Sequence, residues 1–91
     1  MYYVYILISK KDGHLYIGYT PDLRMRIKKH NAGLVRATKY RTPLTLIYYE
    51  AFREQIDAKR REVFLKGGKG RSELKIQLRE CFKNLQYKHK L

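Results

Sequence analysis

The sequence lacks several features that would place it in common classes of small protein. It contains one cysteine, Cys81, which excludes an internal disulfide framework and suits a reducing compartment. It has no tryptophan, so nine tyrosines and three phenylalanines must supply the aromatic part of the core. Its apolar opening, residues 1–8, is far shorter than the roughly 20 residues that a membrane span needs. With no targeting signal in the sequence, we expect a cytoplasmic protein that does not bind membranes.

Acidic residues are scarce in two segments of the chain. The protein has 21 lysines and arginines against 8 aspartates and glutamates, a formal net charge of +13. Residues 23–44 contain seven basic residues and no acidic one, and residues 65–91 contain eight basic and two acidic residues. In the rest of the chain the charges balance. Single basic residues are often only solvated, but two separate segments that hold the whole excess favour a face that binds nucleic acid.

The length allows one hydrophobic core and therefore one domain. We expect residues 1–83 to form this domain and residues 84–91 to be a basic tail. Residues 2–8 and 15–19 are β-branched and aromatic, which predicts two strands, and Asp12-Gly13 between them supplies the turn of a hairpin. Thr20 and Pro21 then favour the start of a helix that ends near Gly33.

The second half of the chain predicts one more strand and two more helices. After a basic loop over residues 34–43, we expect a strand over 44–49 and a helix from about 53 to 66. Glycines 67, 68 and 70 should end that helix, and a last helix should begin at residue 72 and bury Leu74, Leu78 and Phe82. The apolar side of the earlier helix would consist of Ile56, Val63 and Phe64. The order ββαβαα predicts an α+β fold, a small three-stranded antiparallel sheet flanked by helices.

The predicted hairpin brings two phenols together. Residues two apart in a strand share a face, and the hairpin would place Tyr5 close to Tyr16 across the two strands. Gly18 lies on the same face as Tyr16 and, without a side chain, is expected to leave open space beside the rings. A strand tyrosine more often packs in a core, so these positions alone do not establish a site.

Three charged or titratable side chains are predicted to reach the same region. Arg26 and His30 are four residues apart and lie one above the other on the first helix. Glu62 lies next to Val63 and Phe64, an unusual neighbourhood for a carboxylate. A carboxylate can hold a hard divalent ion and an arginine can bind phosphate bidentately, so the set suits phosphoryl chemistry. In a simpler interpretation, Arg26 is a solvated helix residue and His30 lies favourably at a helix end. Glu62 would then pair with a basic neighbour on an exposed face, Lys59, Arg61 or Lys66.

The order of the motifs resembles that of the GIY-YIG nuclease superfamily. These motifs, each on the element it requires, are Tyr3-Val4-Tyr5, Tyr16-Ile17-Gly18, Arg26, His30-Asn31 and Glu62. The resemblance covers residues 2–78, and residues 57–75 are similar to the small stand-alone bacterial branch, described as excinuclease-like or UPF0213-like. Tyr3 stands where the family name has glycine, a position at which many members vary.

The resemblance implies a function for each residue in the hydrolysis of phosphodiester bonds in DNA, in repair, recombination or DNA processing. Tyr5 would activate the attacking water, and Tyr16 would lie close to that water or to the scissile phosphate. Arg26 would neutralise charge on the phosphate, and His30 would share in proton transfer or in holding the phosphate. Glu62 would be the sole protein ligand of one divalent ion, Mg²⁺ or Mn²⁺, which polarises the leaving oxygen.

The basic segments are expected to hold the DNA backbone on either side of this site. In the family the domain usually acts with an attached DNA-binding module, and here these segments or a targeting protein partner would take that part. We expect a monomer or a weak dimer, and a substrate that includes single-stranded or branched DNA. Tyr40 and Tyr49 are candidates for stacking on unpaired bases. The predicted substrate-binding residues are Gly18, Arg36, Lys39, Arg41, Lys66, Lys69 and Arg71.

Two other functions fit the same sequence. A nucleic-acid-binding module that keeps the fold and charge but has no catalytic activity would bind tightly, with strong salt dependence that neither a chelator nor a change at Glu62 alters. An RNA-associated protein would also have this charge, and would prefer RNA to DNA of one sequence. The complete set of five motif residues favours the nuclease.

Overall fold

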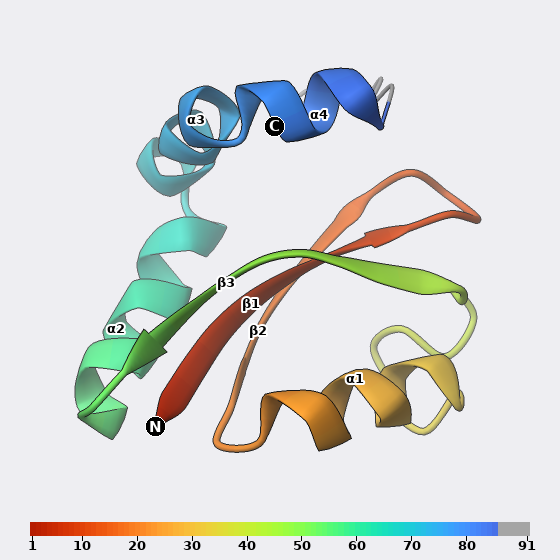
Figure 1. Ribbon diagram of the computed structural model, residues 1–91, viewed down its shortest axis with the longest axis horizontal. Coiled ribbons are helices and arrows are strands. Elements are labelled where there is room, and N and C mark those ends of the chain that lie inside the picture. Colours follow the sequence, from red (N-terminus) through yellow and green to blue (C-terminus); the bar gives the residue numbers. More distant parts are fainter. Residues whose placement is uncertain (86–91) are drawn as a thin grey trace.

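The computed structural model describes residues 1–85 and shows a three-stranded antiparallel sheet with helices on both faces (Figure 1). The central strand is β1 (Tyr2–Ser9), which pairs with β2 (Leu15–Thr20) on one side and with β3 (Leu44–Phe52) on the other. The α+β fold predicted from the sequence is confirmed. Residues 86–91, most of the predicted basic tail, lie outside the described residues.

Four helices are described, one more than predicted. They are α1 (Leu23–Asn31), between β2 and β3, and then α2 (Gln55–Lys66), α3 (Gly68–Gln77) and α4 (Arg79–Asn84). The predicted start of the last helix at residue 72 is therefore wrong, and the structure has two helices where one was predicted. Gly67 ends α2 as expected, but Gly70 lies within α3. Glycine is needed at position 70 because a Cβ there would overlap the carbonyl oxygen of Phe64. The chain turns again at Leu78, the residue between α3 and α4.

The two faces of β1 pack against different layers. On one face, which we call the core face, Val4 and Ile6 pack with Ile17 of β2 and with Leu65 and Leu74 of the helices. Helices α2, α3 and α4 cover this face, and α1 covers the other (Figure 1). The second face, which we call the tyrosine face, carries Tyr5, Leu7, Tyr16 and Leu46. One strand thus contributes alternately to two separate hydrophobic clusters, one on each face of the sheet.

The predicted apolar side of α2 is wrong. Ile56 and Val63 are 66% and 70% exposed, and Phe64 is 40% exposed. The helix meets the sheet through Ala58 and Leu65, which are seven residues apart and therefore on one side of the helix. This rotation turns Ile56 and Val63 toward solvent.

An ion pair between α2 and β3 accompanies this rotation. Arg61 places its Nε 2.9 Å from Oε1 of Glu50 and its NH2 3.0 Å from Oε1 of Glu73 on α3. The Arg61 and Glu50 side chains are 22% and 18% exposed, so the pair lies at the edge of the core. An ion pair therefore holds the side of α2 that carries Arg61 near the sheet, although a hydrophobic pattern alone would place this charged side toward solvent.

The start of α1 depends on a different cap from the predicted one. Asp22 is the N-cap residue, and its side chain accepts a hydrogen bond from the backbone N–H of Met25. The Thr20 hydroxyl instead accepts a hydrogen bond from the N–H of Asp22 at 3.1 Å, which shapes the turn before the helix. Gly33 has a φ of 74° and follows the end of the helix, as expected from the sequence.

Candidate active site

The site begins where Gly18 of β2 lies opposite Tyr5 of β1. In the strand register Tyr16 faces Leu7, so the two tyrosines are diagonal neighbours, with ring centroids 6.2 Å apart. The expected open space at Gly18 is wrong. A Cβ at this position would lie 2.5 Å from the hydroxyl of Tyr5 and 2.9 Å from Cε2 of Tyr16. Glycine is therefore needed here so that both phenol rings can lie over β2.

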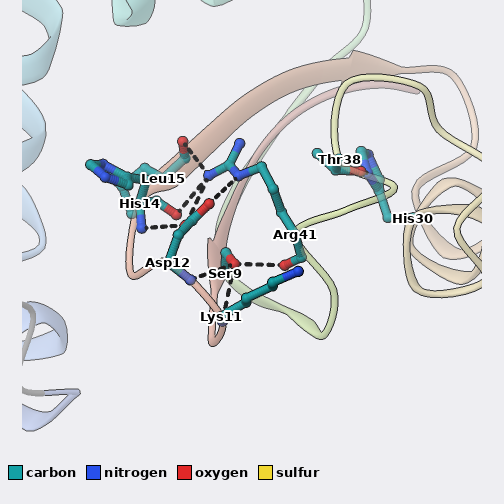
Figure 2. A network of polar contacts seen from close by, with 8 residues as sticks. All are labelled: Ser9, Lys11, Asp12, His14, Leu15, His30, Thr38 and Arg41. Atoms are coloured by element: carbon teal, nitrogen blue, oxygen red, sulfur yellow. Dashed lines mark hydrogen bonds and ion pairs between the residues drawn. The ribbon is translucent and has the colours of Figure 1, made fainter.

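A buried chain of hydrogen bonds leads away from Tyr5. Its hydroxyl oxygen lies 2.7 Å from Nε2 of His30, and Nδ1 of His30 lies 2.7 Å from Oγ1 of Thr38. All three residues are fully buried. Both ring nitrogens of the histidine thus have a partner, which fixes the orientation of the ring. The second of these contacts appears at the right of Figure 2.

Burial keeps this chain electrically neutral. It raises the pKa of Tyr5 to about 12, against the opposing effect of the hydrogen bond from Arg26. Burial is also the main reason why the pKa of His30 is lowered to about 4, and the charge of Arg26 adds to this effect. At neutral pH Tyr5 is therefore protonated and His30 is uncharged.

Arg26 lies at the solvent side of this chain. Its Nε donates a hydrogen bond of 3.4 Å to the hydroxyl oxygen of Tyr5, and this contact is the main reason why the pKa of Arg26 is raised. The side chain is half-buried, and no carboxylate among residues 1–85 forms an ion pair with it. Tyr16 is half-buried as well and packs edge-on against His30, with ring centroids 5.1 Å apart. The guanidinium is thus oriented by the protein and still available to an anion.

Glu62 lies on the side of α2 that meets Tyr19 of β2. On this side Gln55 donates a hydrogen bond of 2.9 Å to the Tyr19 hydroxyl, and the Nζ of Lys59 lies 5.5 Å from the Tyr19 ring centroid. The Glu62 side chain is 22% exposed, and its Oε2 lies 3.1 Å from Nζ of Lys66. The negative charge of Glu62 contributes to the raised pKa of Tyr5, so the carboxylate acts electrostatically on the cluster. Tyr5, Tyr16, Arg26 and His30 are thus in mutual contact, with Glu62 as an electrostatic neighbour.

Comparison with known proteins identifies the family of the chain. A family model described as the GIY-YIG catalytic domain matches residues 1–75. The chain belongs to the GIY-YIG family. A UPF0213 protein of Staphylococcus haemolyticus is 42% identical over 76 residues, which cover 82% of this chain and 92% of that protein. One from Streptococcus pyogenes is 43% identical over 72 residues, or 78% of this chain and 77% of that protein.

Comparison with solved structures also finds a UPF0213 protein. The solution NMR structure of a UPF0213 protein from Bacillus halodurans matches with a TM-score of 0.53 and 40% sequence identity, over 86% of this chain and 85% of that chain. Membership of the GIY-YIG family places the chain in a family of nucleases, which implies a DNA substrate and, generally, a divalent metal ion. None of the helices within residues 1–85 is long and apolar enough to cross a membrane.

The donor atoms at the site suit a hydrated hard cation. Among residues 1–85 no group of three or more His, Cys, Asp or Glu side chains lies together, so a closed zinc-type site is not formed there. Glu62 offers one partly exposed carboxylate. Mg²⁺ is commonly held by one or two carboxylates, with water and substrate phosphate completing the coordination. One partly exposed carboxylate is therefore chemically compatible with such an ion.

Arg41, predicted to bind substrate, is held by the hairpin turn. Its Nε lies 2.7 Å from Oδ2 of Asp12, and its NH2 donates to the backbone oxygen of His14 at 3.2 Å (Figure 2). The hydrogen bond from Arg41 is the main reason why the pKa of Asp12 is lowered to about 2. The backbone oxygen of Arg41 also accepts a hydrogen bond of 2.6 Å from the Ser9 hydroxyl. In this structure Arg41 therefore ties the basic loop to the hairpin.

The other predicted substrate-binding residues fall into two groups. Arg36 and Lys39 are exposed on the loop over residues 34–43, on either side of the buried Thr38. Lys69 and Arg71 are exposed in the first turn of α3, where the sequence had predicted a loop, and the Nε of Arg71 donates to the backbone oxygen of Lys66 at 3.3 Å. Lys66 itself pairs with Glu62. Contact of these residues with DNA stays a prediction.

The sequence did not indicate Thr38, a residue that builds the site. It completes the hydrogen bonds of His30, although nothing in its loop marks it by periodicity. Asn31, which belongs to the His30-Asn31 motif, receives a hydrogen bond of 2.8 Å from the N–H of Leu44 and donates one of 3.0 Å to its oxygen. The Asn31 contacts join the two ends of the basic loop next to His30.

Proposed function

We propose that this protein is a metal-dependent endonuclease that hydrolyses phosphodiester bonds in DNA during repair, recombination or DNA processing. The observation that supports this proposal most strongly is the placement of Arg26. Its guanidinium has no acidic partner within residues 1–85, and the Tyr5 oxygen orients it at the edge of a neutral, buried hydrogen-bond chain. A permanently charged group in this setting is prepared for a phosphate that gains negative charge in the transition state.

The half-buried side chains would contact the substrate. Arg26 would bind a phosphate oxygen, and Tyr16 would orient the attacking water or the phosphate beside it. Glu62 would hold the divalent ion, Mg²⁺ or Mn²⁺, which supplies Lewis-acid stabilisation of the phosphate and of the departing 3′-oxygen. The ion pair of Glu62 with Lys66 would be exchanged on loading, which frees Lys66 for the DNA backbone.

The buried side chains would accept the proton. As the attacking water approaches, its O–H bond breaks and the proton passes to the Tyr5 oxygen, while the Tyr5 hydroxyl proton passes to Nε2 of His30. Thr38 holds the other ring nitrogen so that Nε2 faces Tyr5. A nearby anion raises the pKa of a histidine, so the arriving phosphate would make His30 a better acceptor than it is in the free protein. Hydrogen bonds of this kind are often long before substrate binds, as is the Arg26 contact with Tyr5.

A cleavage panel tests the proposed activity. Labelled single-stranded, duplex, flap and branched DNA would be incubated with the protein and Mg²⁺ or Mn²⁺, each with a parallel sample in EDTA. We expect cleavage of at least one DNA structure that EDTA abolishes. Binding without cleavage, unaffected by EDTA, would contradict the proposal and support a non-catalytic nucleic-acid-binding module. A panel of matched RNA strands would separate the RNA-associated alternative.

A further inference from the structure

A concave surface lies along the side of α1 that carries Arg24, Ile27 and Lys28. It is a groove of about 610 Å³ between α1 and β3, a volume within the range of about 300–1,000 Å³ that is typical of ligand sites. Its floor is apolar, formed by the partly buried Ile27 and Leu46. Tyr3 and Tyr49 line one wall, with ring centroids 6.0 Å apart at an interplanar angle of 62°. We call this surface the α1–β3 groove.

Tyr49 is the residue of the groove that most indicates a ligand. Its side chain is 51% exposed, although it is a large aromatic residue in a strand, and Tyr3 packs against its ring. A tyrosine braced in this way offers a large flat surface at a small cost in side-chain entropy. In the sheet register Tyr49 pairs with Tyr5, and neighbouring strands lie about 4.8 Å apart. The groove is therefore adjacent to the catalytic cluster, one strand further along the tyrosine face.

The charge of the groove favours an anionic ligand. Arg24 and Lys28 line it, are exposed, and form no ion pair among residues 1–85. Asp22 also lines it, but this carboxylate accepts a hydrogen bond from Met25 as the cap of α1. An aromatic face with two free cations beside it is the combination that binds an unpaired base together with its flanking phosphates.

We propose that the α1–β3 groove binds an unpaired nucleobase and its phosphates, next to the strand that is to be cut. The base would stack on Tyr49, and Arg24 and Lys28 would hold the backbone. This inference deepens the proposed function, and rests on it only in taking a polynucleotide as the substrate. It predicts that the protein prefers DNA with a single-stranded segment over a fully paired duplex, because a paired base cannot leave its stack to reach the groove without an energetic cost.

The test measures binding in EDTA, so that no cleavage is required. Fluorescence anisotropy would compare the full-length protein on a blunt duplex and on the same duplex with a short single-stranded overhang, made as DNA and as RNA. The variants are Tyr49→Leu, which removes the aromatic face, and Tyr49→Phe, which keeps it. Lys28→Gln removes one cation of the groove, and Lys75→Gln on α3 is the matched charge control. Thermal melting would show that each variant is folded.

The wild type and Tyr49→Phe should bind the overhang about five- to tenfold more tightly than the blunt duplex. In Tyr49→Leu this preference should disappear while blunt-duplex affinity stays unchanged. Lys28→Gln should reduce the salt dependence of overhang binding by about one phosphate contact, and Lys75→Gln should not. Loss of the overhang preference in Tyr49→Leu, with the DNA overhang, the RNA overhang or both, supports the proposal and shows which kind of nucleic acid the groove binds.

A preference for the overhang that survives in Tyr49→Leu, or no preference in the wild type, would overturn the inference. Competition by an acidic peptide and not by single-stranded nucleic acid would also overturn it, by assigning the groove to a protein. The result is independent of the nuclease proposal. If the protein cuts no DNA but Tyr49→Leu loses the preference for the overhang, the groove proposal stands and the nuclease proposal fails. If the protein cuts DNA but Tyr49→Leu keeps the preference, the nuclease proposal stands and the groove proposal fails.

Discussion

The two faces of the sheet use the same strand for different purposes. On the core face, Val4 and Ile6 are buried in a hydrophobic cluster with Leu65, Leu74 and Phe82. On the tyrosine face, the residues that alternate with them lead to a buried histidine and a buried threonine, held by hydrogen bonds of 2.7 Å. A hydrophobic cluster tolerates the exchange of one apolar side chain for another of similar volume. A buried hydrogen-bond chain instead requires every donor and acceptor, because an unpaired buried polar group is costly. The comparison predicts that substitutions in the core-face cluster lower mainly the stability, and that substitutions at the hydrogen-bond chain of the tyrosine face lower mainly the cleavage rate.

The largest expected effect is on cleavage, from Arg26→Ala on the tyrosine face. Removing the cation that stabilises the phosphate should lower the single-turnover cleavage rate by about 10³-fold or more. The melting temperature should change little, because Arg26 is only half-buried and makes one long hydrogen bond. The control is Lys29→Ala, an exposed cation on the same helix that should cut at nearly the wild-type rate. Equal losses in the two variants would mean that overall charge, and not a specific contact, is responsible.

The opposite pattern is expected for Leu74→Ala on the core face. This fully buried side chain of α3 should cost about 2–5 kcal/mol of unfolding free energy, measured by urea denaturation. The folded fraction should still cut DNA at close to the wild-type rate, because Leu74 belongs to the cluster on the other face from Tyr5. A large loss of cleavage in a sample shown to be folded would break the separation between the faces.

Gly18→Ala should affect both properties, since it is the glycine over which the phenols pack. The added methyl would meet Tyr5 and Tyr16 and force both rings to move, at a cost of about 1–3 kcal/mol in stability. A displacement of this kind should slow cleavage by about 100-fold. The matched variant is Gly68→Ala, at the start of α3, where a Cβ meets nothing within 4 Å and stability should rise by about 0.4–1 kcal/mol. Similar behaviour of the two variants would contradict the packing assigned to Gly18.

A smaller effect should appear in the pH dependence of stability. The pKa of His30 is about 4 in the folded protein and about 6.5 when unfolded, so the unfolded state binds more protons between these values. The contribution of neutral His30 is therefore complete above pH 6.5, and the unfolding free energy should fall as the pH drops from 6.5 to 4. His30→Gln should flatten this slope in urea titrations. Asp12→Asn should change the pH dependence of stability at lower pH. The hydrogen bond from Arg41 lowers the pKa of Asp12 from its ordinary value of 3.8 to about 2, so the stabilisation by this carboxylate is lost as the pH falls through this range.

The local parts of the fold could be predicted from the sequence. β-branched and aromatic residues on either side of Asp12-Gly13 identified the hairpin, and a glycine with a positive φ at position 33 follows α1 as expected. The parts set by contacts between elements could not be predicted. The burial of Ala58 in place of Ile56 depends on how α2 docks, which the Arg61 ion pair with Glu50 helps to fix.

The site shows the same division. Spacing and resemblance identified Tyr5, Tyr16, Arg26 and His30, which do meet in the structure. Thr38 could not be found, because it reaches His30 through a loop that has no regular period. The ion pair of Arg41 with Asp12 joins residues 29 apart in sequence, and no local pattern indicates it.

The most direct test of the account compares two carboxylates that differ in position but not in charge. Single-turnover cleavage with Mg²⁺ would be measured for Glu62→Gln and for Glu54→Gln, an exposed residue at the start of α2. We predict that Glu62→Gln cuts about 10³-fold more slowly than the wild type, because the divalent ion loses its protein ligand, and that Glu54→Gln cuts at nearly the wild-type rate. Cleavage by folded Glu62→Gln at the rate of Glu54→Gln would contradict the assignment of the active site.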